Sequence, residues 1–98
     1  MRIVKKMIDH INDELEGAAE YAEKYIENRA MGKTTRASAY REMAKDELRH
    51  AGNIYGYAIE DIEAIKKVYS MSPEAEVMWE HELKLYADCV AKIGMMLS

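Results

Sequence analysis

The sequence predicts an all-α protein, with a long antiparallel helical hairpin followed by a third, C-terminal helix. Apolar residues recur at spacings of three and four over two long segments, as they do on the buried face of a helix. A third segment of this kind follows the only proline, and no stretch alternates apolar and polar residues as a strand would. We therefore expect one helical domain over residues 1–98, with helices at about 3–30, 36–69 and 73–97.

The first expected helix, at about 3–30, has a continuous apolar face and a clear end. Arg29 lies in its last turn and Gly32 just beyond it, which are C-terminal stop signals. The linker over 31–35 is short, so the second helix has to return antiparallel to the first. The apolar positions of the first helix are Val4, Met7, Ile8, Ile11, Leu15, Ala18, Ala22, Tyr25 and Ile26.

The second helix, at about 36–69, would be on the order of 50 Å long. A lone hairpin of that length buries one side of each helix, which is hard to stabilise in so small a monomer. The third helix begins at Ser72-Pro73-Glu74, with a serine N-cap, a proline in the first turn and an acid near the positive end of the helix dipole. Its apolar seam consists of Trp79, Leu83, Tyr86, Val90, Ile93 and Leu97.

Composition and charge exclude several classes of protein. A net charge of −4 offers no basic stripe for nucleic acid, and no apolar run approaches the roughly 20 residues that span a bilayer. The single cysteine, Cys89, excludes an intramolecular disulfide and any metal site made of cysteines alone. We expect a soluble, cytoplasmic protein without a nucleic-acid or membrane partner.

Three polar residues stand on the apolar faces of the expected hairpin. Glu14 and His50 are equidistant from Gly32, so an antiparallel hairpin brings them level. Glu47 falls near the middle of the apolar stripe of the second helix, with His50 on its flank, because positions three apart are neighbours on a helix surface. A buried carboxylate is costly unless it is paired, protonated or bound to metal. Two carboxylates and an imidazole suit iron or manganese above all.

An alternative interpretation of the same residues involves no metal. Glu47 could form a buried hydrogen bond with a tyrosine or arginine, and His50 could be a flank histidine with nothing attached. Glu20 lies on the polar face and is not level with Glu47, so we exclude it as a ligand. Glu82, near the apolar seam of the third helix, could be buried or could face a site, and is kept as an extra ligand candidate.

Two motifs of the hairpin together resemble a known family. They read Glu14-Leu-Glu-Gly-Ala-Ala-Glu-Tyr21 and Ala44-Lys-Asp-Glu47-Leu-Arg-His50-Ala51. A glutamate with a tyrosine two turns later, followed by Ala-x-x-Glu-x-x-His-Ala, resembles the first half of a rubrerythrin or bacterioferritin. Those proteins belong to the ferritin-like di-iron carboxylate superfamily, and the resemblance covers roughly residues 7–58.

The resemblance implies a di-iron site, with manganese as the alternative metal. Glu14, Glu47 and His50 would be the metal ligands. Tyr21 would hydrogen-bond a ligand carboxylate and Asp46 would be the partner of the ligand histidine, because outer groups of this kind orient ligands. The activity implied is oxidation of Fe(II) by O₂ or peroxide, as in a ferroxidase.

A complete ferritin-like bundle has four helices and two such ligand sets, and this chain supplies one set. We therefore expect a homodimer or a higher even oligomer, whose two hairpins form the four-helix bundle around one shared site. The two-helix encapsulated ferritins look similar. The third helix would cover the flank of the bundle or exchange between subunits. The alternative is a non-enzymatic helical dimer, a ferritin-like structural or interaction module without a functional metal site.

Overall fold

The computed structural model describes residues 2–98 and consists of three α-helices, with no β-strand among those residues. α1 spans Arg2–Ala30, α2 spans Thr34–Val68 and α3 spans Pro73–Leu97. The all-helical prediction is confirmed, and every helix boundary lies within two residues of the expected one. None of the helices over residues 2–98 is long and apolar enough to cross a membrane.

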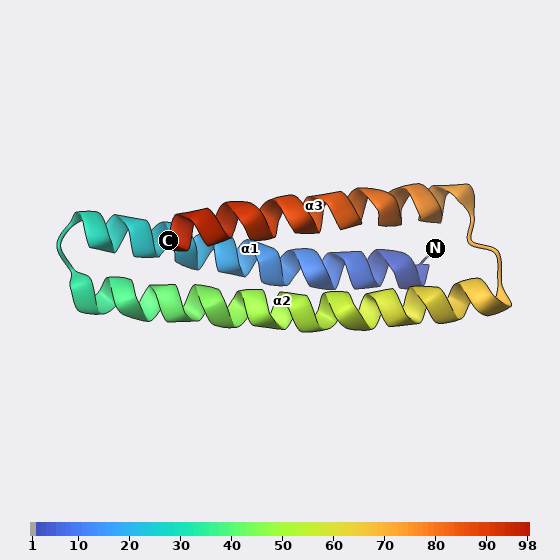
Figure 1. Cartoon of the computed structure of the whole chain (residues 1–98), viewed down its shortest axis with the longest axis horizontal. Helices are drawn as coiled ribbons and strands as arrows, with labels where there is room; N and C mark the ends of the chain where they lie inside the picture. The colour runs from blue at the N-terminus through green and yellow to red at the C-terminus, as the bar shows by residue number, and fades with distance from the viewer. Residues whose placement is uncertain (1) are drawn as a thin grey trace.

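The three helices run side by side along a molecule that measures 54 × 19 × 18 Å (Figure 1). α1 and α2 form the antiparallel hairpin, and α1 packs against both of the other helices. The hairpin turn lies at one end of the molecule and the linker between α2 and α3 at the other. α3 therefore returns along α1 of its own chain and covers a flank of the hairpin.

The hairpin turn depends on Gly32. Its φ of +73° lies in the left-handed region that favours glycine. The amide of Gly32 donates a hydrogen bond to the carbonyl of Arg29 at 3.0 Å. The amide of Lys33 donates to the carbonyl of Asn28 at 2.9 Å, which completes a Schellman cap. The chain thus reverses within three residues, and the predicted stop signal is confirmed.

α3 is held at both of its ends. At its start, Oγ of Ser72 accepts a hydrogen bond from the amide of Ala75 at 3.2 Å, and Pro73 occupies the first helical position. At its end, Nε of Arg41 on α2 donates to the carbonyl of Leu97 at 2.8 Å. The N-cap was predicted from the sequence, whereas the contact with Arg41 joins residues far apart in the chain.

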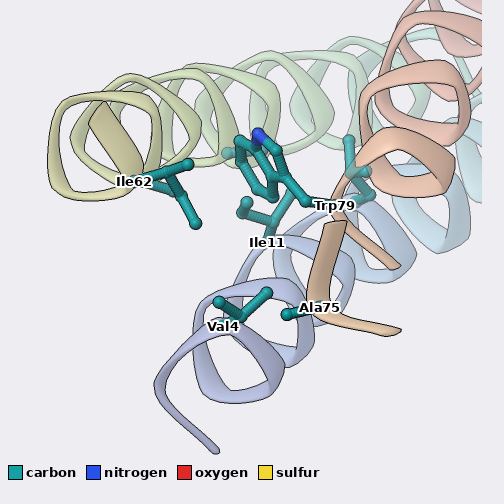
Figure 2. Packing of buried hydrophobic residues seen from close by; sticks show 8 residues of the cluster. Val4, Ile11, Ile62, Ala75 and Trp79 are labelled. Atoms are coloured by element: carbon teal, nitrogen blue, oxygen red, sulfur yellow. The ribbon is translucent and has the colours of Figure 1, made fainter. Parts of the chain in front are cut away.

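The core combines small residues of α2 with larger side chains of α1 and α3. Alanines at every seventh position of α2 lie on one face and let α1 approach closely: Ala37, Ala44, Ala51 and Ala58, all at most 3% exposed. Trp79 of α3 packs near Val4, Ile11 and Ile62 (Figure 2). Burying an aromatic side chain of this kind removes about 200 Å² from water, worth up to about 5 kcal/mol.

Candidate metal centre

Glu14 of α1 meets Glu47 and His50 of α2 in the groove between the two helices of the hairpin. One potential ligand atom from each residue lies within 4.8 Å of the other two. Nδ1 of His50 lies 3.7 Å from Oε2 of Glu14 and 3.8 Å from Oε1 of Glu47. The equal distance of Glu14 and His50 from the turn thus correctly predicted that these side chains meet.

The cluster lies on the side of the hairpin that α3 does not cover. Arg41 binds the end of α3, and Gly52 faces the hydroxyl of Tyr86 on α3. These two residues lie about 180° and 160° around α2 from His50. The side chain of His50 is accordingly 44% exposed, and that of Glu47 is 27% exposed. Glu47 is therefore partly exposed, and not central to the buried stripe as expected, because the stripe that α3 and α1 bury runs through the alanines beside it.

Gly17 on α1 leaves room for the carboxyl group of Glu47. A Cβ atom on Gly17 would lie 3.0 Å from Oε2 of Glu47 and 3.6 Å from its Cδ. Gly17 lies within the first motif, but its role at the site was not predicted. A glycine inside a strongly periodic helical segment was the signal that could have found it, because such a glycine lowers helix propensity.

The two carboxyl groups of the cluster interact directly. The pKa of Glu47 is raised, first because its side chain hydrogen-bonds Glu14 and second because it is partly buried. The negative charges of Glu14 and Asp46 raise this pKa further, and the charge of His50 opposes them. A hydrogen bond between two carboxyl groups requires a proton on one of them. A raised pKa means that Glu47 keeps its proton to a higher pH than an ordinary glutamate does, at a position where a cation could take the place of that proton.

The donor atoms suit a transition metal, and their spacing is close to what one ion requires. Ligands held about 2.1 Å from an octahedral ion lie about 3 Å apart when adjacent and about 4 Å apart when opposite. The separations of 3.7 and 3.8 Å around Nδ1 of His50 lie between these two values, so the side chains would have to move together by less than about 1 Å to bind one ion as adjacent ligands. Two carboxylates and one imidazole suit iron or manganese, whereas the single cysteine lies outside the cluster. Three donors also leave about half of an octahedral coordination shell open.

Tyr21 and Asp46 each make a side-chain contact outside the cluster, and their expected contacts with the ligands stay predictions. Tyr21 stacks on Tyr40 with ring centroids 6.2 Å apart, nearer to the hairpin turn than the cluster is. Asp46 is exposed and lies 3.5 Å from Nη2 of Arg49. In the single chain, therefore, Tyr21 has an aromatic partner and Asp46 has a basic one.

Glu82 lies apart from the cluster. Its side chain is 1% exposed and hydrogen-bonds Asn12, on the side of α1 that faces α3. Asn12 and Glu14 are two residues apart and so project about 160° from each other around the helix. Within one chain, Glu82 therefore faces away from Glu14. Glu20, which the sequence analysis excluded as a ligand, is exposed and outside the cluster.

No family model, curated protein or solved structure matches this chain. The function of the chain therefore rests on the chemistry of Glu14, Glu47 and His50, on their surroundings and on the motifs that contain them. The chemistry available to these side chains is the binding of a cation by two acids and a histidine, on a face open to another molecule.

Proposed function

We propose that this chain is a ferritin-like protein that binds iron through Glu14, Glu47 and His50 and oxidises Fe(II). The observation that carries the proposal is the convergence of the three ligand atoms within 4.8 Å of one another. The likeness of both motifs to those of rubrerythrins and bacterioferritins supports iron as the metal. Manganese is the competing metal, because the same oxygen and nitrogen donors suit it.

In this proposal a second copy of the chain completes the site. A di-iron site of a ferritin-like bundle takes a glutamate from each of two helices and a Glu-x-x-His pair from each of the other two. Two hairpins related by a two-fold axis would supply this set, with each of the three ligands present twice. The functional form is then a homodimer or an even multiple of one.

Exposed apolar side chains on the same side of the hairpin as the cluster support this pairing. Met43 and Tyr57 lie seven residues before and after His50, so they project from nearly the same side of α2. Met43 is 45% exposed and Tyr57 is 63% exposed. On α1, Ile3 projects from the same side as Glu14 and is 60% exposed. A second hairpin laid on this face would cover the apolar side chains and exclude water from the ligands.

Fe(II) is the substrate of the proposed reaction, and its electron passes to O₂ or peroxide. Glu14 and Glu47 attract the cation once Glu47 has lost its proton, which its raised pKa delays to a higher pH than for an ordinary glutamate. Their anionic oxygens stabilise Fe(III) more than Fe(II), because the attraction grows with the charge of the ion. His50 adds a nitrogen donor without adding negative charge. These contributions together favour the oxidised product.

Oxidation of Fe(II) under air tests the proposal. The wild-type protein should oxidise Fe(II) faster than buffer alone does. A near-ultraviolet absorption of Fe(III) carboxylate should appear and saturate at about two irons per dimer, since there is one shared site per bundle. Replacing Glu47 or His50 by alanine should remove both effects, whereas Glu20→Ala, on the exposed side of α1, should leave them unchanged. Absence of saturation in the wild type, or loss of activity in Glu20→Ala, would reject the proposed site.

A further inference from the structure

Two side-chain atoms are buried without a hydrogen-bond partner in the part of the chain that the structure describes, and they belong to neighbouring residues. They are Oδ1 of Asn12 on α1 and Oε2 of Glu82 on α3. Glu82 is only 1% exposed, and with Ile11 it is one of the two largest fully buried side chains. The side chain of Asn12 lies within hydrogen-bonding reach of Glu82 and lowers the pKa of its carboxyl group. Polar atoms buried without a partner are rare, so this pair requires a physical explanation.

Neither oxygen can satisfy the other as it stands, because an amide oxygen and an ionised carboxylate are both acceptors. The only side-chain donor of Asn12 is its Nδ2 group, which serves one oxygen of Glu82. A proton on the other oxygen, Oε2, would let the carboxyl group donate to Oδ1 of Asn12. The acid and the amide would then be joined by two hydrogen bonds in a ring, and a single proton would satisfy both atoms.

We infer that Glu82 is a neutral carboxylic acid when α3 is docked on α1, and that this proton is part of what holds α3 in place. Loss of the proton would leave a negative charge on a buried carboxyl group, and Oδ1 of Asn12 could not donate a hydrogen bond to it. A buried charge of this kind is unfavourable unless it is paired. The docking of α3 therefore weakens when Glu82 ionises.

The groups around Glu82 agree with a neutral acid. Burial is the largest influence and raises the pKa of Glu82, and the negative charge of Asp9 on α1 raises it further. The hydrogen bond from Asn12 and the charge of His81 on α3 act in the opposite direction. None of the groups that shift the pKa of Glu82 belongs to α2, whose Tyr55 stacks on the rings of Trp79 and Tyr86, about one turn to either side of Glu82.

The direction of the pH effect follows from the raised pKa. In the unfolded chain Glu82 would titrate near the ordinary carboxyl value of 4.5. Between that value and the raised one, the folded protein binds a proton that the unfolded chain has lost. The stabilisation is therefore complete at pH values below the ordinary pKa and is lost as the pH rises through the raised pKa of Glu82.

The position of Trp79 makes the docking of α3 directly measurable. Trp79 is the only tryptophan of the chain and precedes Glu82 by one turn of α3. It is 6% exposed, and its ring lies 6.2 Å from that of Tyr55 on α2, centroid to centroid. If α3 moves away from the hairpin, Trp79 becomes exposed to water and its fluorescence shifts to longer wavelength.

The test compares the wild type with Glu82→Gln and with Glu80→Gln, an exposed control on the same helix. Glutamine presents one donor and one acceptor, so it reproduces the neutral acid at every pH. As the pH is raised from about 5 to about 8, the melting temperature of the wild type should fall and its fluorescence should shift to longer wavelength. Glu82→Gln should lose the part of this dependence that Glu82 contributes, keep the part that the raised pKa of Glu47 contributes, and be the more stable protein at the higher pH, while Glu80→Gln should follow the wild type.

A second measurement needs no substitution at Glu82. The ¹³C chemical shift of each glutamate carboxyl, followed against pH in the wild type, should give a midpoint for Glu82 well above that of the exposed Glu80. A midpoint for Glu82 at or below that of Glu80 would overturn the inference. So would a Glu82→Gln protein whose melting temperature keeps the pH dependence of the wild type.

Discussion

Oε2 of Glu47 lies 3.0 Å from the point that a Cβ atom would occupy on Gly17, across the groove between α1 and α2. A glycine inside a helix is less stable than an alanine by about 1 kcal/mol. At this position the missing side chain has a local consequence, because the carboxyl group of Glu47 uses the space. The residue at position 17 therefore affects both the stability of α1 and the position of the Glu47 carboxyl group in the candidate site.

Replacing Gly17 by alanine should separate stability from metal binding. The gain in helix propensity should stabilise the protein by up to about 1 kcal/mol, because the crowded carboxyl group is the flexible end of a side chain and can shift by a few tenths of an ångström. The same shift should weaken metal binding. Thermal unfolding and metal titration measure the two effects. Gly56→Ala is the matched control, since a Cβ there would meet nothing within 4 Å. Metal affinity that is unchanged in Gly17→Ala would remove Gly17 from the site.

Metal binding should strengthen as the pH rises. The pKa of Glu47 is raised because its side chain hydrogen-bonds Glu14, so a proton occupies the pair on the acid side of that pKa. A metal ion has to displace this proton before both carboxylates can bind it. For each proton displaced, the affinity should fall by up to about tenfold per pH unit below the raised pKa. Titrations at several pH values, in buffers of different ionisation enthalpy, would count the protons released. An affinity that does not vary with pH would contradict the raised pKa of Glu47.

Thermal melts with and without Fe(II) should distinguish a metal site from a helical module without metal. Glu47→Leu should stabilise the metal-free protein, because apolar volume replaces a partly buried carboxyl group. Anaerobic Fe(II) at a hundred times its dissociation constant should stabilise the wild type by about 2.7 kcal/mol, a rise in melting temperature on the order of 10 °C. The mutant should show no such rise. A wild-type melt that Fe(II) leaves unchanged would count decisively against a metal site.

The cluster face should mediate self-association. Light scattering should give about twice the chain mass of 11.3 kDa, or a multiple of that. Met43→Glu and Tyr57→Glu place a charge beside the cluster and should shift the protein towards the monomer. Val77→Glu is the control, because Val77 is equally exposed, at 66%, but belongs to α3. A stable monomer of 11.3 kDa at micromolar concentration would exclude a shared site.

The helices and their ends could be predicted from the sequence because the interactions that set them are local. The Ser72 cap bonds the amide three residues later, and the Gly32 cap closes within one turn of α1. The meeting of Glu14 with His50 was also predictable, because a short turn fixes the register of the two helices that it joins. The metal and the dimer stay predictions, since each involves a second molecule or ion.

Tertiary structure alone decided which polar side chains share a face. Periodicity placed Glu82 near an apolar seam but could not say what that seam covers. α3 packs on the side of α1 that carries Asn12, so Glu82 meets an amide there and lies away from Glu14. The same docking leaves Glu47 partly exposed. The angle at which α3 settles around α1 depends on side chains far apart in the chain, such as Tyr55 stacked on Tyr86. A one-dimensional pattern fixes the apolar stripe of each helix, and packing decides which neighbour covers each part of it.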